Sequence, residues 1–176
     1  MQAILLKDTS IAKINKQIEL QLLRYKELQQ RPLNPLSVFT LPVVVHIIHN
    51  NGVENISNAR VLAGIQHLNE AYANTGYYDP SSGVNTNIQF CLAQRDPNGL
   101  ATTGITRNVS GYTNMGGAYY ASDDMNVKNI NRWDPGYYIN IWLVNDIPGS
   151  VAGYAYLPAA HATNVDGILM EAAYFG

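Results

Sequence analysis

The stretch FTLPVVVHIIH, from Phe39 to His49, is apolar and rich in β-branched residues at both alternating sets of positions. Side chains alternate between the two faces of a strand, so this pattern predicts a central strand that is covered on both sides. Asn50-Asn51-Gly52 follows it and has the composition of a turn that ends the strand.

The residues after this strand predict a helix. Ser57 is a suitable N-cap, and Asn74-Thr75-Gly76 has the composition of a C-terminal stop. Apolar residues at helical spacing form one stripe: Val61, Leu62, Ile65, Leu68 and Tyr72. A strand is expected next, from Asn87 to Gln94, so strand, right-handed helical crossover and strand form the start of an α/β sheet.

The remaining residues predict a long loop and three further strands. The loop runs from about Ser110 to Asp134, and loops of this length in compact domains are usually functional or disordered. Trp133-Asp134-Pro135 is expected to fix its end onto the sheet. The later strands are predicted at Tyr138 to Val144, Ala152 to Leu157 and Gly167 to Tyr174.

The N-terminal segment is predicted to be separate from this sheet. Ser10 to about Gln30 has apolar residues at steps of three and four, as in an amphipathic helix. RPLNPLS, from Arg31 to Ser37, contains two prolines that cannot continue a helix. We therefore expect a boundary after residue 37, with one domain from 38 to 176.

Composition limits the classes of partner. Charged residues make up 14% of the 176 residues and the net charge is -2, so the chain has no basic surface for nucleic acid or anionic lipid. The sequence shown contains neither a transmembrane segment nor a credible signal peptide. Cys91 is the only cysteine, so it has no partner within the chain for a disulfide.

No catalytic constellation is evident from the residues alone. His46 and His49 lie three apart on the predicted strand and should point to opposite faces, which favours a core histidine and a strand-end histidine over a shared metal. His67 and His161 are expected to be satisfied or solvated. Asp123-Asp124 could help to hold a hard cation such as calcium, but solvated loop acids are the favoured interpretation.

The order of several motifs is more informative. LPVVVHIIHNNG, NISNARVLAGIQHLNEAYANTG, NIQFCLAQRDPNGLATTGITR, WDPGYYINIWLVND, AGYAYLP and DGILMEAAYFG occur in this order between Leu41 and Gly176. This series resembles the pappalysin-like (cytophagalysin) family of zinc metalloendopeptidases. The resemblance covers nearly all of the predicted globular part.

The resemblance implies the upper subdomain of a metzincin. This is a twisted five-stranded α/β sheet with flanking helices, mostly parallel, with one antiparallel edge strand at the rim of the substrate cleft. By order, the edge strand comprises Ala152, Gly153, Tyr154, Ala155, Tyr156 and Leu157. An edge strand can bind an extended peptide through its free backbone groups, and the small Gly153 and Ala155 would allow close approach.

The family's zinc motif, H-E-x-x-H-x-x-G-x-x-H, is absent from the sequence, so no catalytic residue or metal ligand can be assigned to it. The resemblance therefore implies the N-terminal portion of a secreted bacterial zinc endopeptidase, inactive alone, preceded by a pro-segment-like helix in residues 1–37. Zinc would belong to the full-length enzyme, and the partner would be a peptide or protein substrate. The alternative is a non-catalytic peptide-binding or structural module. In either case an exposed sheet edge favours self-association.

Overall fold

The computed structural model describes residues 13, 16, 18–20, 22–23, 37–115, 120–149, 151–156 and 163–176. The chain divides into two units, Met1–Ser37 with Leu157–Ala160 and Val38–Tyr156 with His161–Gly176. Within the predicted N-terminal helix, the described residues Lys13, Lys16, 18–20 and 22–23 are helical, and the others lie outside the described residues.

The second unit is built on a mixed α/β sheet whose centre is β1 (Phe39–His49), with the bounds that the sequence predicts. The side chains of Val43, Val44, Val45, Ile47 and Ile48 are fully buried, which confirms that both faces of β1 are covered. Each such side chain contributes about 1.5–3 kcal/mol through burial. None of the described helices is long and apolar enough to cross a membrane.

The sheet contains six strands, in the order β2-β1-β4-β6-β5, with β3 also paired to β1. All pairings are parallel except that of β5 with β6. The other strands are β2 (Ile88–Leu92), β3 (Ile105–Val109), β4 (Ile139–Val144), β5 (Gly153–Ala155) and β6 (Ile168–Glu171). The mostly parallel sheet with one antiparallel edge strand is therefore confirmed, with one strand more than the five expected, because β3 is not predicted from the sequence.

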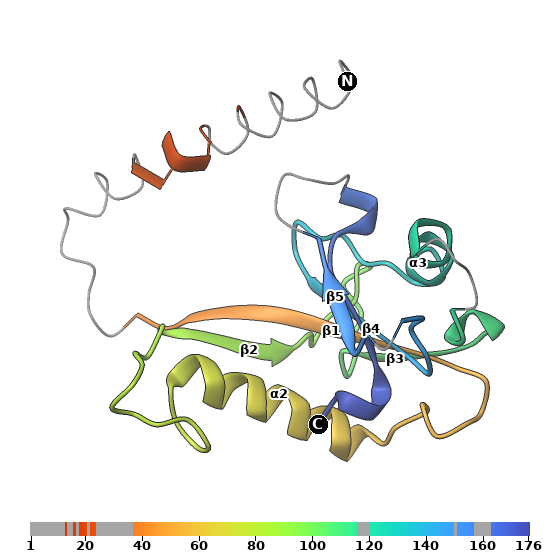
Figure 1. Cartoon of the computed structure of the whole chain (residues 1–176), viewed down its shortest axis with the longest axis horizontal. Helices are drawn as coiled ribbons and strands as arrows, with labels where there is room; N and C mark the ends of the chain where they lie inside the picture. Colours follow the sequence, from red (N-terminus) through yellow and green to blue (C-terminus); the bar gives the residue numbers. More distant parts are fainter. Residues whose placement is uncertain are drawn as a thin grey trace. The chain divides into compact units, whose positions relative to one another are not determined.

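The helix α2 (Asn58–Ala73) covers one face of the sheet and runs along β1 and β2 (Figure 1). Ser57 caps it by accepting a hydrogen bond from the Arg60 backbone, and Asn74 ends it in the left-handed conformation, as predicted. Val61 and Ile65 are buried against the odd-numbered residues of β1. Leu62 is 57% exposed, so including it in the apolar stripe was wrong.

The opposite face of the sheet is covered by the residues between β3 and β4. We expected a long loop from about Ser110 to Asp134, but the structure has a 3-10 turn, η1 (Gly111–Thr113), and the helix α3 (Tyr120–Lys128) there. Val127 packs with Ile48, Trp142 and Leu169 in a second core. Trp133 is buried, which confirms that the end of this excursion is fixed onto the sheet.

Candidate functional site

The antiparallel strand β5 lies at the edge of the sheet. It pairs with β6 through Gly153 opposite Met170, Tyr154 opposite Leu169 and Ala155 opposite Ile168. Among the described residues, no other strand pairs with β5. Gly153, Tyr154 and Ala155 thus belong to the predicted edge strand, Ala152 and Tyr156 flank it, and Leu157 lies outside the described residues.

The ladder determines which backbone groups face outward. The Glu171 N–H donates to the carbonyl oxygen of Ala152 at 2.9 Å. Hydrogen-bonded and non-hydrogen-bonded pairs alternate along an antiparallel ladder, so the pairs of Gly153 and Ala155 are non-hydrogen-bonded. The N–H and C=O groups of Gly153 and Ala155 therefore point away from β6, toward the free edge.

Gly153 is required at its position by the approach of the neighbouring strand. A Cβ there would lie 2.5 Å from the Met170 Cβ and 3.0 Å from the Leu169 carbonyl oxygen. Real Cβ atoms essentially never come within 3.0 Å of each other, so a side chain at position 153 would force β5 and β6 apart. The two residues with outward backbone groups, Gly153 and Ala155, are both small and both exposed.

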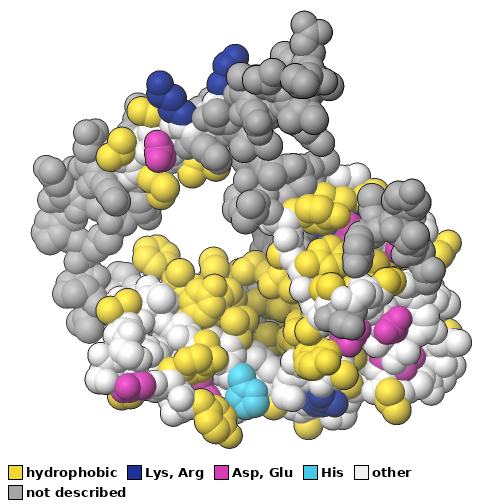
Figure 2. All heavy atoms as spheres, viewed as in Figure 1, with side chains coloured by type: hydrophobic (Ala, Val, Ile, Leu, Met, Phe, Trp, Pro, Cys, Tyr) yellow, Lys and Arg dark blue, Asp and Glu magenta, His cyan; other side chains and the backbone are white. Residues whose placement is uncertain are grey.

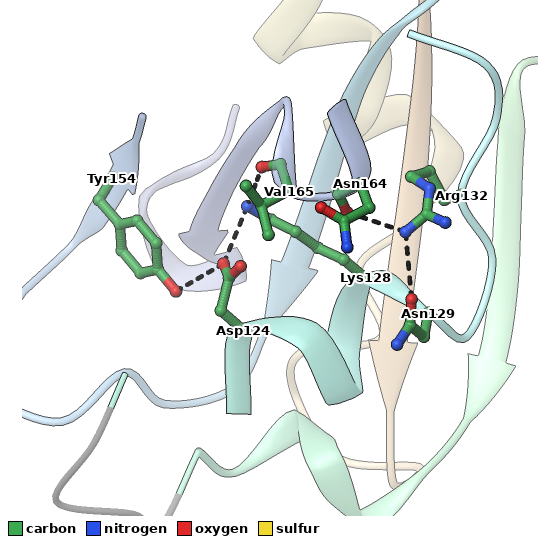
Figure 3. Close-up of polar contacts among 7 residues, drawn as sticks. All are labelled: Asp124, Lys128, Asn129, Arg132, Tyr154, Asn164 and Val165. Atoms are coloured by element: carbon green, nitrogen blue, oxygen red, sulfur yellow. Dashed lines mark hydrogen bonds and ion pairs between the residues drawn. The ribbon is translucent and has the colours of Figure 1, made fainter. Parts of the chain in front are cut away.

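Tyr154 lies between them and points to the face covered by α3. Its hydroxyl donates to Asp124 Oδ1 at 2.9 Å, and the Lys128 ammonium contacts the same oxygen at 2.8 Å (Figure 3). Burial, followed by the hydrogen bond to Asp124, raises the pKa of Tyr154 well above its ordinary value. Burial lowers the pKa of Lys128, while Asp124 opposes this shift.

This arrangement corrects the interpretation of Asp123-Asp124 as solvated loop acids: both lie in α3, and Asp124 is not solvated. Asp124 is fully buried in α3, where it forms an ion pair with Lys128, whose side chain is equally inaccessible. The spacing of four residues between an acid and a lysine is the available sequence signal, since such pairs face each other on a helix. Burial of the pair results from tertiary packing, and no local sequence pattern predicts it.

The histidines do not form a site. His46 is buried, with Nδ1 2.8 Å from the Thr106 hydroxyl and Nε2 3.0 Å from Asn140 Oδ1, and burial lowers its pKa to about 4. His49 is buried at the end of β1, where Nδ1 accepts a hydrogen bond from the Asn51 backbone. Both agree with the favoured interpretation. His67 is solvent-exposed on α2, and His161 lies outside the described residues.

The described residues do not form a cluster of metal ligands. In residues 37–115, 120–149, 151–156 and 163–176, no three histidine, cysteine or acidic side chains come together as a metal site would require. Asp124 Oδ1 is already shared by Lys128 and Tyr154. Calcium binding by Asp123-Asp124 stays a prediction.

An open apolar hollow lies beside the edge strand on the α2 face. Its volume is about 290 Å³, and its lining includes Leu68 of α2, Ile141 of β4, and Ile168 and Met170 of β6. Ile168 and Met170 are also the residues opposite Ala155 and Gly153. Figure 2 shows hydrophobic side chains gathered on the face of the second unit that is turned toward the viewer. The exposed edge of β5 therefore adjoins an apolar surface.

No protein-family model and no curated protein sequence matches the chain. Solved structures of mirolysin do. Mature mirolysin of Tannerella forsythia in complex with a cleaved peptide is 36% identical, with a TM-score of 0.68, over 81% of this chain and 56% of that one. A promirolysin mutant of the same organism is 36% identical, with a TM-score of 0.66, over 81% and 49% of the two chains.

Mirolysin in complex with compound 9 is 37% identical, with a TM-score of 0.65, over 80% of this chain and 55% of that one. The chain thus spans about half the length of the mirolysin chains that it matches. Its mixed α/β sheet with one antiparallel edge strand has the metzincin-like architecture of mirolysin, a metalloprotease.

Proposed function

We propose that this chain is the upper subdomain of a secreted, pappalysin-like zinc metalloendopeptidase and that it binds substrate along β5. Residues 38–176 would form the substrate-rim part of the catalytic domain, and residues 1–37 would be the end of a pro-segment. Zinc would supply an activated water for peptide hydrolysis. Its family ligands belong to a motif that this sequence does not contain.

One observation carries the binding part of the proposal. The outward N–H and C=O groups of Gly153 and Ala155 are two residues apart on a strand edge, which is the spacing at which an extended peptide pairs. Small side chains at both positions leave room for the peptide backbone. Mature mirolysin, to which this chain is similar, forms a complex with a cleaved peptide, which supports a peptide as the class of ligand.

Peptide binding can be measured on the chain itself. The probe is a short fluorescein-labelled peptide of alternating threonine and valine with lysine at both ends. Its binding is measured by fluorescence polarisation. Ala155→Pro removes the outward N–H, and proline is tolerated on the solvent side of an edge strand. We expect affinity to fall about tenfold, since one hydrogen bond and the approach of the peptide are lost.

Two controls separate backbone pairing from other contacts. Ala155→Ser retains both the N–H and a small side chain at an exposed position, and should bind within about twofold of wild type. The peptide with every backbone nitrogen methylated cannot donate backbone hydrogen bonds and should not bind. Equal affinity for both peptides would rule out strand addition at this edge.

The catalytic part needs the product of the natural reading frame that contains this chain. We expect bound zinc and cleavage of casein that a chelator abolishes. A product that binds the Thr-Val peptide but contains no zinc and cleaves nothing would instead establish the alternative, a non-catalytic peptide-binding module. Secretion, self-association through β5 and the absence of nucleic-acid or membrane partners stay predictions.

A further inference from the structure

The buried ion pair of α3 is connected to both the edge strand and the segment that leads back into the sheet. Lys128 Nζ donates to the Val165 carbonyl at 2.6 Å as well as contacting Asp124. Arg132 donates to the Asn164 carbonyl at 2.8 Å (Figure 3). Together, α3 and Arg132, which follows it, contact β5 through Tyr154 and also the residues just before β6.

Aromatic rings complete the surroundings of the lysine. The ammonium of Lys128 lies 4.9 Å from the ring centroid of Tyr156, 5.8 Å from that of Tyr154 and 5.5 Å from that of Trp142. These distances are within the range of cation–π attraction. Two of the three rings belong to residues in or next to β5, and the third belongs to β4, so the same ammonium group contacts the edge strand and the sheet interior.

The buried Asp124–Lys128 ion pair is expected to add little to the stability of the fold by itself. Burying two charges costs desolvation that their attraction often only just offsets, and apolar replacements of similar volume are frequently as stable. Asp124 Oδ2 is also buried with no hydrogen-bond partner among the described residues. A role in fixing geometry accounts for such a pair better than a gain in stability does.

The strand that it contacts needs external support. β5 has three residues and, among the described residues, a ladder on one side only, so few backbone hydrogen bonds hold it to β6. Tyr154 is its central residue, and its side chain reaches into the protein on the α3 face. Gly153 and Ala155, on either side of it, contribute little side-chain packing of their own.

We propose that Asp124 and Lys128 are positioning residues, which hold β5 through Tyr154 and Tyr156 so that the backbone groups of Gly153 and Ala155 stay aligned for an extended peptide. This inference rests on the proposed peptide-binding function of β5. It assigns the excursion between β3 and β4 a role in substrate binding without any contact between α3 and the substrate.

The anchoring can be measured without a peptide, by amide hydrogen exchange. The Glu171 N–H, bonded to the Ala152 carbonyl, reports on the β5–β6 ladder, and the Val45 N–H, bonded to the Gly104 carbonyl, reports on the sheet centre. Tyr154→Phe retains the ring and loses the hydroxyl. We expect exchange at Glu171 to accelerate about tenfold or more and exchange at Val45 to stay within about twofold.

Two further variants make the result specific. Asp124→Leu combined with Lys128→Met replaces the ion pair by apolar side chains. This double variant should accelerate amide exchange at Glu171 by about as much as Tyr154→Phe does. Tyr138→Phe also removes one hydroxyl hydrogen bond, to the Arg95 carbonyl, and should leave the amide exchange rate at Glu171 unchanged. Unchanged exchange at Glu171 in Tyr154→Phe, or equal acceleration at Glu171 and Val45, would overturn the inference.

Binding of the fluorescein-labelled Thr-Val peptide then tests the link to function. We expect Tyr154→Phe and the double variant to bind about tenfold more weakly, and Tyr138→Phe to bind like wild type. If wild type binds and Tyr154→Phe binds equally well, the positioning role fails and the proposed function stands. If wild type does not bind, the proposed function fails, together with the positioning role that rests on it.

Discussion

Gly153 and Met170 face each other across the β5–β6 ladder so closely that a Cβ on Gly153 would lie 2.5 Å from the Cβ of Met170. The edge strand can therefore keep its distance from β6 only while residue 153 lacks a side chain. This contact sets the position of the outward backbone groups that we propose for peptide binding.

Gly153→Ala should push β5 away from β6. Overpacking of this kind costs about 1–3 kcal/mol, and we expect a loss of peptide affinity together with a lower free energy of unfolding in urea. Gly111→Ala is the matched control, because a Cβ there meets nothing within 4 Å. The control should stay within about 0.5 kcal/mol of wild type. Tight peptide binding by Gly153→Ala would contradict the geometry assigned to the edge.

The buried pair should show strong coupling between its members. Lys128→Met alone leaves the Asp124 carboxylate buried without its cation and should cost about 3–5 kcal/mol in urea unfolding. Adding Asp124→Leu removes that charge, so the double variant should recover most of the loss. A double variant whose loss equals the sum of the two single losses would mean that the pair does not act as a unit.

His46 should make stability depend on pH. Its pKa is lowered from 6.5 to about 4 by burial, with the Asn140 hydrogen bond opposing the shift. The unfolded chain takes up the proton first, so stability is complete above about pH 6.5 and falls by about 3 kcal/mol as pH drops to about 4. Urea unfolding across this range should show the loss, and His46→Gln should flatten it. His67→Gln, the same substitution at an exposed position, should leave the free energy of unfolding at pH 7 within about 0.5 kcal/mol of wild type.

Asn140 should be the most sensitive polar residue of the sheet centre. Its Oδ1 accepts from the Trp133 N–H at 2.9 Å and lies 3.0 Å from His46 Nε2, and its Nδ2 donates to the Trp133 carbonyl at 3.0 Å. Asn140→Ala leaves these buried groups without partners and should cost about 3 kcal/mol, measured by tryptophan fluorescence during unfolding. Asn145→Ala, at an exposed position, should cost less than about 0.5 kcal/mol. Similar midpoints for the two variants would contradict this assignment.

The elements that were predicted correctly carry their information locally. β1 combines β-branched residues with apolar positions on both faces, and α2 has a suitable cap at each end and a stripe of apolar residues. The starts of β4 and β6 were also close to those observed, but β6 ends at Glu171 and not at Tyr174, because Ala172–Tyr174 forms a 3-10 turn. The antiparallel edge strand was expected from the order of family motifs, since its three residues have no pattern of their own.

The missed elements lack such local patterns. β3, with the sequence ITRNV, is half polar and lies beside β1 without a fully buried side chain. α3, with the sequence YASDDMNVK, has no clear apolar stripe and is held by the buried Asp124–Lys128 pair and by Val127. Both elements depend on contacts with residues far away in the chain.

Part of the candidate site can likewise be predicted from the sequence, and part depends on tertiary contacts. The sequence alone shows that the edge strand carries two small residues, Gly153 and Ala155. Which of their backbone groups face outward depends on the register with β6, and the support from α3 depends on a contact between Tyr154 and Asp124, thirty residues apart. Periodicity along a chain encodes which face of an element is apolar, whereas ladder register and buried ion pairs arise only from the free energy of long-range packing.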